Sequence, residues 1–318
     1  METDQFALAC SRILDEVEKA VVGKRAFLEK VLSAFLAEGH VLIEDFPGLA
    51  KTLTARCFAA VLGLTFKRIQ FTPDLLPADI TGGYILNRRN GSFELVKGPL
   101  FANIILGDEI NRAPPKTQAA MLEAMEEHQV TLEGETHALP RPFFVIATQN
   151  PIEYEGTFPL PEAQLDRFMV RLSIGYPSPA EELEILERRW RRAEDQASLS
   201  GVTDSAEIQQ MKKTIEGVLV DEDVERYMVS LVHATRTASQ LAVGASPRAS
   251  LAFLKLSRIR AAMQGRMYVL PDDVKDFASD ILVHRLMLKP DMWGTGHSAR
   301  SVTESILSTV EVPKVNVP

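Results

Sequence analysis

Short apolar runs and segments with helical spacing alternate along roughly the first half of the chain. The apolar runs are typical of strands, and they are HVLIED (40–45), LTFKRIQFT (64–72), NIILGDE (103–109), RPFFVIATQN (141–150) and RFMVRLSIG (167–175). The first run is followed by LTARCFAAVLG (53–63), whose apolar residues recur at helical spacing until a glycine ends the pattern. This alternation predicts an α/β fold with a doubly wound parallel sheet between layers of helices.

Two segments inside this region read as hairpins. In YILNRRNGSFELV (84–96) the pair Asn90-Gly91 separates two alternating runs, and VTLEGETHALP (130–140) turns around Gly134. Because both interrupt the alternation of strands and helices, we expect them to be insertions into the core.

The second half of the chain has a helical pattern almost throughout. A helix is predicted to begin at or just after Ser178, and its Glu-Arg pairs four residues apart indicate a solvated face. After a loop at DQASLSGVTD (195–204), further helices are predicted at ERYMVSLVHATRTAS (225–239), SPRASLAFLKLSRIRAAM (246–263) and PDDVKDFASDILVHRL (271–286). The predicted organisation is an α/β domain with an N-terminal helix (1–178), a small all-α domain (179–310) and an extended tail (311–318).

Composition and charge narrow the class of protein. The chain has 318 residues, is 46% hydrophobic and carries a net charge of -8 with spread lysines and arginines, which argues against a nucleic-acid binder held mainly by phosphate contacts. We find neither a secretory signal nor an apolar run long enough to span a membrane, so a cytoplasmic location is expected. The two cysteines, Cys10 and Cys57, cannot form a disulfide framework, and a small buried thiol is expected for Cys57. The six histidines lack metal-ligand spacing.

The segment EDFPGLAKT (44–52) lies between a predicted strand and a predicted helix, which is the context of a phosphate-binding loop. Against the pattern G-x-x-x-x-G-K-[ST], however, Asp45 and Ala50 stand where glycines belong. Ala50 adds one methyl group, whereas a carboxylate at Asp45 would repel a triphosphate if it faced the ligand. The loop alone therefore does not decide whether this segment binds the phosphates of a nucleotide.

Polar residues that could act on a phosphate follow two other predicted strands. Asp108 and Glu109 end a central strand, where one carboxylate can hold Mg²⁺ and the other can polarise water, although an isolated pair of this kind is more often a solvated strand end. Asn150 ends the next strand and could bind the attacking water or serve only as a turn former. Arg167 and Arg248 could supply positive charge to phosphoryl transfer or could simply pair with Asp166 or a surface glutamate.

A family resemblance connects these residues. The segments VVGKR (21–25), EDFPGLAKT (44–52), QFTPDLLPADITGG (70–83), GPLFANIILGDEINRAPPKTQAAMLEAMEEHQVTLEGE (98–135), FFVIATQNPIEYEGTFPLPEAQLDRF (143–168) and GASPRAS (244–250) together resemble the MoxR family of AAA+ ATPases. The resemblance runs in order from about Val21 to about Leu288. It implies a P-loop NTPase of the AAA+ type, with an α/β nucleotide-binding core and an all-α lid.

The resemblance also implies roles for individual residues. The nucleotide would be surrounded by Val22, Gly23, Pro47, Gly48, Leu49, Ala50, Lys51, Thr52 and Leu53. Lys51 would act on the β/γ-phosphates, Thr52 and Asp108 would hold Mg²⁺, and Glu109 would be the Walker B glutamate. Asn150 would be sensor 1, Arg167 the arginine finger and Arg248 sensor 2, with Arg112 a further interface candidate. Loops of the form x-x-x-P-G-x-[GA]-K-T are usual in the family, so Ala50 is no departure, and the side chain of Asp45 is expected to turn away from the phosphates.

The function implied by the resemblance is a cytoplasmic, Mg²⁺-dependent ATPase that forms a homo-oligomeric ring, expected to be a hexamer. It would remodel or mature protein clients, among them proteins with von Willebrand A domains, and its hairpins would face the central pore. Whether the two arginines act within one subunit or across an interface stays open. The alternatives are an ATP-binding scaffold with little turnover, a nucleic-acid motor and, least favoured, a small-molecule kinase.

Overall fold

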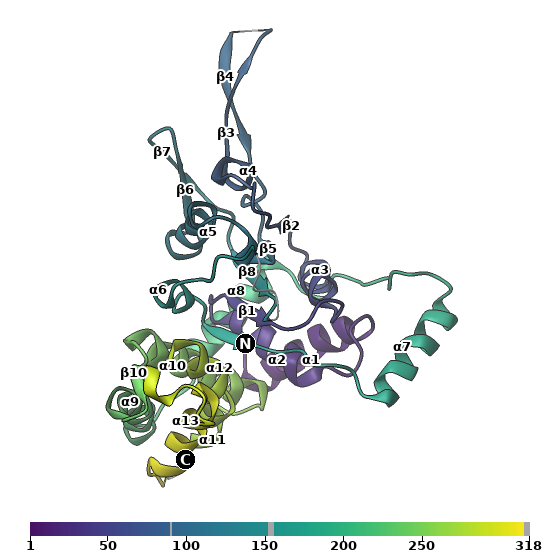
Figure 1. The fold of residues 1–318 in the computed structure, drawn as a ribbon. Helices are drawn as coiled ribbons and strands as arrows, with labels where there is room; N and C mark the ends of the chain where they lie inside the picture. The colour runs from purple at the N-terminus through teal and green to yellow at the C-terminus, as the bar shows by residue number, and fades with distance from the viewer. Residues whose placement is uncertain (90, 152–155, 315–318) are drawn as a thin grey trace.

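The computed structural model describes residues 1–89, 91–151 and 156–314. At its centre five parallel strands lie in the order β2-β5-β8-β1-β9 (Figure 1). Their bounds are β1 Val41–Glu44, β2 Phe66–Gln70, β5 Ile104–Asp108, β8 Phe144–Gln149 and β9 Val170–Leu172. The predicted parallel sheet is therefore confirmed, and each of the five predicted strands belongs to it.

Helices from the first half of the chain surround this sheet. They are α1 Thr3–Glu18, α2 Arg25–Leu36, α3 Lys51–Val61, α4 Pro77–Thr81, α5 Pro115–Glu127, α6 Glu162–Leu165 and the short 3₁₀ turn η1 Ile110–Arg112. Cys10 and Cys57 are buried in α1 and α3, and burial raises the pKa of the Cys57 thiol to about 11. The expectation of a small buried thiol at Cys57 is confirmed.

Both predicted hairpins are present and project from the core. One consists of β3 Gly82–Asn87 and β4 Ser92–Lys97, the other of β6 Gln129–Leu132 and β7 Glu135–Ala138. They extend toward the same end of the molecule (Figure 1), and the hydroxyl of Tyr84 donates to Glu135 across them over 2.6 Å. Gly134 has φ of 85°, as its turn requires, while Asn90 of the other turn lies outside the described residues.

The second half of the chain is mostly helical. Its helices are α7 Pro179–Arg192, α8 Ser205–Glu216, α9 Glu222–Thr237, α10 Pro247–Met263, α11 Pro271–Asp276, α12 Ala278–Leu282 and α13 Ala299–Thr309, with the 3₁₀ turns η2 Val283–Arg285 and η3 Pro290–Met292 and a small sheet of β10 Leu241–Val243 and β11 Met287–Leu288. The helices α8 to α13 pack together as the helical domain, whereas α7 lies apart from them on the other side of the sheet (Figure 1). Of the predicted extended tail, residues 315–318 lie outside the described range. No helix in the described part of the chain combines the length and hydrophobicity needed to cross a membrane.

The predicted single helix over 271–286 is wrong, because the chain breaks at Phe277 between α11 and α12. Phe277 is buried, with φ of -102° and ψ of -2°, and the ammonium group of Lys30 donates a hydrogen bond to the carbonyl of Asp276. In a continuing helix a backbone N–H would donate to this carbonyl. Here the ammonium group of Lys30 from α2 donates to it instead.

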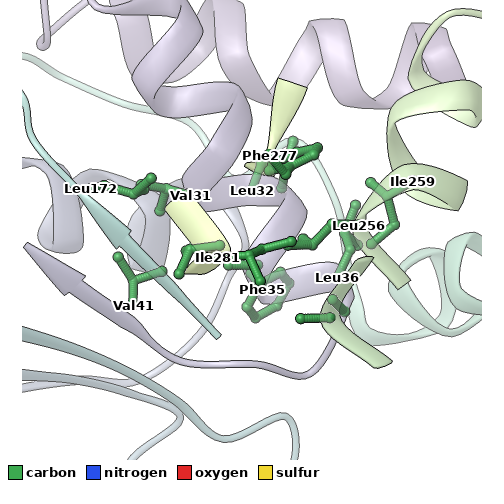
Figure 2. Close-up of a cluster of buried hydrophobic side chains, with 14 of the residues drawn as sticks. Val31, Leu32, Phe35, Leu36, Val41, Leu172, Leu256, Ile259, Phe277 and Ile281 are labelled. Atoms are coloured by element: carbon green, nitrogen blue, oxygen red, sulfur yellow. The ribbon is translucent and has the colours of Figure 1, made fainter. Parts of the chain in front are cut away.

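One hydrophobic cluster joins the sheet to the helical domain. Figure 2 shows Val31 and Leu32 of α2 packed together with Val41 of β1, Leu256 of α10 and Ile281 of α12, all of them buried. Because α2 follows an apolar pattern with period near 3.6, it can bury one stripe against the sheet and another against the helical domain. The two halves therefore share a core.

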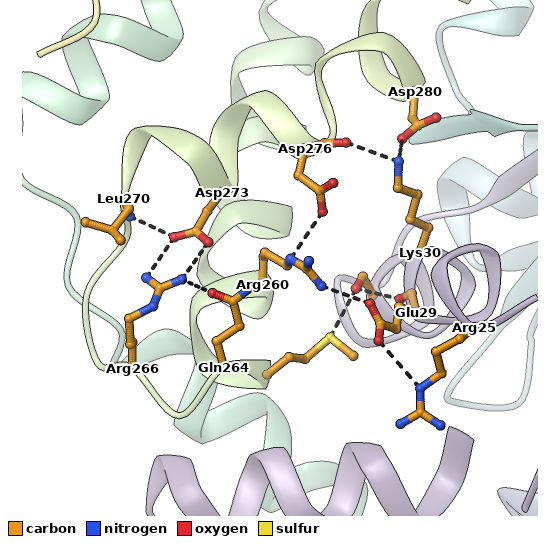
Figure 3. A network of polar contacts seen from close by, with 12 residues as sticks. Arg25, Glu29, Lys30, Arg260, Gln264, Arg266, Leu270, Asp273, Asp276 and Asp280 are labelled. Atoms are coloured by element: carbon orange, nitrogen blue, oxygen red, sulfur yellow. Dashed lines mark hydrogen bonds and ion pairs between the residues drawn. The ribbon is translucent and has the colours of Figure 1, made fainter. Parts of the chain in front are cut away.

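Ion pairs run along the same contact. In Figure 3, Glu29 of α2 accepts from Arg260 of α10 at 2.9 Å, and Arg260 also reaches Asp276 at 3.2 Å. Lys30 lies 2.5 Å from Asp280 of α12. These partly exposed pairs contribute little energy individually, but they fix the position of α2 against the helical domain.

Candidate active site

The loop 45–50 between β1 and α3 has the shape of a phosphate loop. Ala50 adopts the left-handed conformation, with φ of 56° and ψ of 19°, and α3 begins at the next residue, Lys51. For a residue other than glycine this conformation costs about 1–2 kcal/mol of conformational free energy. The loop keeps its turn in spite of that cost. The ammonium group of Lys51 donates to the carbonyl of Asp45, which holds it across the mouth of the loop.

The side chain of Asp45 is turned away from this loop and is only 5% exposed. One carboxylate oxygen accepts from the backbone N–H groups of Ile174 and Gly175 at 2.7 and 2.8 Å. It also accepts from the hydroxyl of Ser173 at 2.9 Å, while the other oxygen accepts from the N–H of Phe46. Burial raises the pKa of Asp45, but these hydrogen bonds outweigh it, and the pKa lies below its ordinary value of 3.8. The expected orientation is confirmed: Asp45 ties the loop to the chain after β9.

A cavity of about 440 Å³ opens beside the loop and brings together residues that the sequence assigned to catalysis. Lys51 and Thr52 line it from α3, Asp108 and Glu109 from the end of β5, and Asn150 from the end of β8. β5 and β8 are neighbouring parallel strands, which is why their carboxyl ends meet at the same edge of the sheet. The rest of the wall is formed by Pro47, Gly48, Leu49, Ala50, Leu53 and Arg68.

The two acidic residues at the end of β5 have different partners. Asp108 accepts from the hydroxyl of Thr148 at 2.7 Å through one oxygen, and from Arg68 at 2.7 Å through the other. Glu109 has φ of 58° and accepts from Gln70 at 2.7 Å and from Arg112 at 3.0 Å. Arg68 also donates to Gln70, so one network links the two carboxylates although their direct partners differ.

Arg68 and Gln70 were missed by the sequence analysis. They lie two residues apart on β2, and Gln70 is the register partner of Asp108 on β5. The period of a strand places such residues on the same face, so the polar pair in FKRIQ was a usable signal. The sequence did not reveal that β2 adjoins β5.

Arg167 and Arg248 do not line the cavity beside the loop. Both pair with Glu126 of α5, Arg167 at 2.9 Å, in a second cavity of about 270 Å³ between the α/β core and the helical domain. The neighbouring Asp166 accepts from Arg285 at 2.8 Å and from Ser246, the N-cap of α10. Asp166 therefore fixes the start of α10, and with it Arg248, next to Arg167.

Val22 and Gly23 also lie outside the cavity beside the loop. Val22 is buried, and Gly23 lines another cavity, of about 280 Å³, together with Ser173 and Ile174. Those two residues are hydrogen-bonded to Asp45, so the carboxylate stands between the phosphate loop and this third cavity.

The residues assigned to Mg²⁺ fit a hard cation. The hydroxyl of Thr52 and the carboxylate of Asp108 are oxygen donors on the wall of the same cavity. Within residues 1–89, 91–151 and 156–314, no group of three or more His, Cys, Asp or Glu side chains is placed to hold a metal ion. Mg²⁺ commonly takes one or two protein ligands and completes its shell with phosphates and water, so a two-ligand site is sufficient. Arg68 now donates to one oxygen of Asp108 and would have to release that oxygen for Mg²⁺ to bind there.

Two known domain families match the chain. The family described as "ATPase family associated with various cellular activities (AAA)" matches residues 40–170, and the family described as "AAA lid domain" matches residues 233–306. The first match covers the phosphate loop, both carboxylates, Asn150 and Arg167. The second contains Arg248.

Individual proteins match over nearly their whole length. The chain is 45% identical to the protein YeaC of Bacillus subtilis (strain 168) over 95% of this chain and 94% of the relative. It is 44% identical to "Chaperone MoxR1" of Mycobacterium tuberculosis, over 96% of this chain and 82% of the relative. A crystal structure of a protein from Cytophaga hutchinsonii superposes with a TM-score of 0.91 at 41% identity, covering 98% of this chain and 97% of that one.

Proposed function

Since this chain belongs to the MoxR family of AAA+ ATPases, we propose that it hydrolyses ATP with Mg²⁺ at the subunit interfaces of a ring and thereby remodels protein clients. The observation that carries the proposal is the cavity beside the phosphate loop. A lysine, a hydroxyl, two carboxylates and an amide, drawn from α3, β5 and β8, line its wall together. A site of this composition suits transfer of a phosphoryl group to water better than binding alone.

Each group has a distinct part in that reaction. Lys51 and the backbone of the loop bind the phosphates, and the first turn of α3 adds the positive end of a helix dipole. Thr52 and Asp108 would hold Mg²⁺, which when bound offsets negative charge on the phosphates. Glu109 accepts a proton from the attacking water, and Asn150 orients that water by hydrogen bonding.

The carboxylate of Glu109 is held through one of its two oxygens. It accepts from Gln70 and Arg112, and both contacts compete with a water molecule for the same oxygen. Glu109 can therefore act as a base through Oε1, while Gln70 and Arg112 hold the carboxylate in place through Oε2.

The positions of the arginines support a site shared between subunits. Arg167 and Arg248 lie with Glu126 between core and lid, whereas Lys51 lines a different cavity. Phosphoryl transfer gains from an arginine supplied in trans, and a neighbouring copy could present both side chains at once. A ring of six is the family's implied assembly and is part of the proposal, as is a cytoplasmic location.

The hairpins support contact with protein clients. Ile85, Leu86, Phe93 and Val96 of the longer hairpin are exposed although apolar, and this hairpin projects from the core (Figure 1). Exposed apolar groups of this kind bind other polypeptides. Clients with von Willebrand A domains are those that the family resemblance favours.

The experiment that tests the proposal is steady-state release of phosphate from Mg·ATP by the wild type and by Glu109→Gln. We expect the variant to bind ATP in calorimetry while releasing phosphate about 10²–10⁴ times more slowly, because the general base is gone. Equal, background-level rates in both proteins would instead favour an ATP-binding scaffold. The scaffold alternative arises because a carboxylate at Asp45 could face the phosphates and repel them. The buried position of Asp45 weakens that argument.

A further inference from the structure

Helix α7 carries an apolar stripe that nothing in the described chain covers. Leu183, Leu186 and Trp190 are 58%, 64% and 81% exposed, and α7 has no buried residue. Their spacing of three and four residues places them along one side of the helix. An isolated helix of 14 residues is marginal in water, so this helix needs contacts beyond its own hydrogen bonds.

The opposite side of α7 is attached to the core. Glu181 lies 3.8 Å from Lys24, and Arg188 donates to the carbonyl of Glu18 over 2.5 Å. On a helical wheel Glu181 and Arg188 lie roughly opposite the stripe. The core therefore holds the helix in an orientation that turns Leu183, Leu186 and Trp190 outward.

This attachment lies close to the phosphate loop. Tyr176, two residues before the N-cap of α7, stacks on Phe46 with ring centroids 5.7 Å apart, and Phe46 directly precedes the loop residues Pro47 and Gly48. Figure 1 shows α7 on one side of the sheet, with α6 and α10, the elements next to Arg167 and Arg248, on the other side.

We propose that the stripe of α7 docks on a second copy of this chain, on the side that carries Arg167 and Arg248. The inference rests on the proposed sharing of the ATP site between subunits. If a neighbour brings its arginine side to this chain's phosphate loop, the same neighbour also meets α7. A single head-to-tail contact then covers both the phosphate loop and the stripe of α7.

That side of the molecule offers a receiving surface, which we call the paired grooves. One groove, of about 270 Å³, includes Arg248 and Leu251, and the other, of about 290 Å³, includes Lys212 and Ile215. They adjoin, since both are lined by Glu38 and Lys255. The lining of the grooves is mixed in charge, but its lysines and arginines outnumber its acidic side chains, and this basic excess complements a stripe that is bordered on α7 by Glu182 and Glu187.

The charge of α7 favours a protein over a membrane as the occupant. The helix contains four glutamates and four arginines, so its net charge is zero. Amphipathic helices that bind anionic membranes carry an excess of lysine and arginine. A contact that uses α7 of one copy and the paired grooves of the next is heterologous, and such contacts close into a ring when the rotation between neighbouring copies allows it.

The first test is Trp190→Ser, compared with the matched control Val229→Ser. Val229 on α9 is also apolar and 58% exposed, but lies outside the stripe and the grooves. In sedimentation velocity with Mg·ATP, we expect Trp190→Ser to need at least about tenfold more protein for half-assembly, as for a central aromatic contact. The control should assemble like the wild type, and both monomers should melt like the wild type because both side chains are exposed.

Cross-linking identifies the partner surface. Leu186→Cys chains mixed with Lys255→Cys chains should form a disulfide-linked dimer that neither variant forms alone, and the native Cys10 and Cys57 are buried. Several results would overturn the inference: assembly without this cross-link, a cross-link within Leu186→Cys alone, a wild type that stays monomeric, or binding to phosphatidylglycerol vesicles that Trp190→Ser abolishes.

Calorimetry with Mg·ATP separates this inference from the proposed function. If the wild type binds ATP while Trp190→Ser assembles normally, only the docking of α7 is wrong. If the wild type binds no ATP, the proposed function is wrong irrespective of assembly.

Discussion

At the scale of single residues, the phosphate loop shows how a motif can be lost in sequence and kept in structure. Ala50 takes the backbone conformation of the missing glycine, and Asp45 uses its carboxylate to hold the chain after β9. The resemblance predicted that Asp45 turns away. Its acceptance of two N–H groups from Ile174 and Gly175 could not be predicted, because those residues meet the loop only after β9 has paired with β1.

We expect Asp45→Ala to destabilise the protein. The substitution leaves the N–H groups of Ile174 and Gly175 without their acceptor, at a cost of about 1–3 kcal/mol. Urea unfolding at pH 7 measures the loss, and Asp195→Ala, whose side chain is 90% exposed, serves as the control with little change. A variant as stable as the wild type would contradict the structural role of Asp45.

The contribution of Asp45 should also depend on pH in a defined direction. Because the folded pKa of Asp45 lies below 3.8, the ionised carboxylate stabilises the fold fully above that value. The advantage of the wild type over Asp45→Asn should therefore be constant near neutral pH and shrink as the pH falls below 3.8. An advantage that grows on acidification would contradict the assignment.

At the scale of elements, the strands were predictable and their order was not. Apolar runs identified all five strands of the sheet, yet nothing in FKRIQ indicates that β2 pairs with β5 and brings Arg68 to Asp108. The small sheet of β10 and β11 and the break at Phe277 were also missed, since each depends on contacts with distant parts of the chain.

His40 joins three elements and should make stability depend on pH. Lying just before β1, its ring accepts from the N–H of Val145 in β8 and donates to the carbonyl of Met125 in α5, which requires a neutral imidazole. Burial lowers the pKa of His40 from 6.5 to about 4. The unfolded chain therefore binds a proton between these values while the folded chain does not, and the free energy of unfolding should fall by about 3 kcal/mol as the pH drops from 6.5 to 4.

Urea unfolding of wild type and His40→Gln over this pH range measures the effect of His40 separately from that of His284, whose pKa burial also lowers. The wild type should be the more stable protein at pH 7, and the difference should narrow toward pH 4. A difference that does not change with pH would show that His40 does not titrate as described.

At the scale of the whole molecule, the sequence predicted an α/β domain and a helical domain but not their shared core. The cluster around Val31, Leu32 and Ile281 draws on both parts of the chain (Figure 2). Helix patterns tell which side chains are buried, whereas they do not tell which partner covers them.

We therefore expect a chain that ends at residue 178 not to fold stably by itself. Removing the helical domain would expose Val31, Leu32 and Leu36 of α2 to water. Such a fragment should bind a hydrophobic dye and lack near-ultraviolet circular dichroism, whereas a chain ending at residue 314 should behave like the full protein. A cooperative unfolding transition of the shorter fragment would contradict the shared core.

The central claim is that the site beside Lys51 is completed by the arginines of a neighbouring copy, and mixing two inactive variants tests it most directly. Glu109→Gln lacks the base and Arg167→Ala lacks the arginine finger, so each should release phosphate slowly when alone. In an equimolar mixture, roughly a quarter of the interfaces would combine an intact Glu109 with an intact Arg167 from the next copy. The account predicts that phosphate release rises toward that fraction of the wild-type rate. A mixture no more active than its two components, although the chains assemble together, would contradict it.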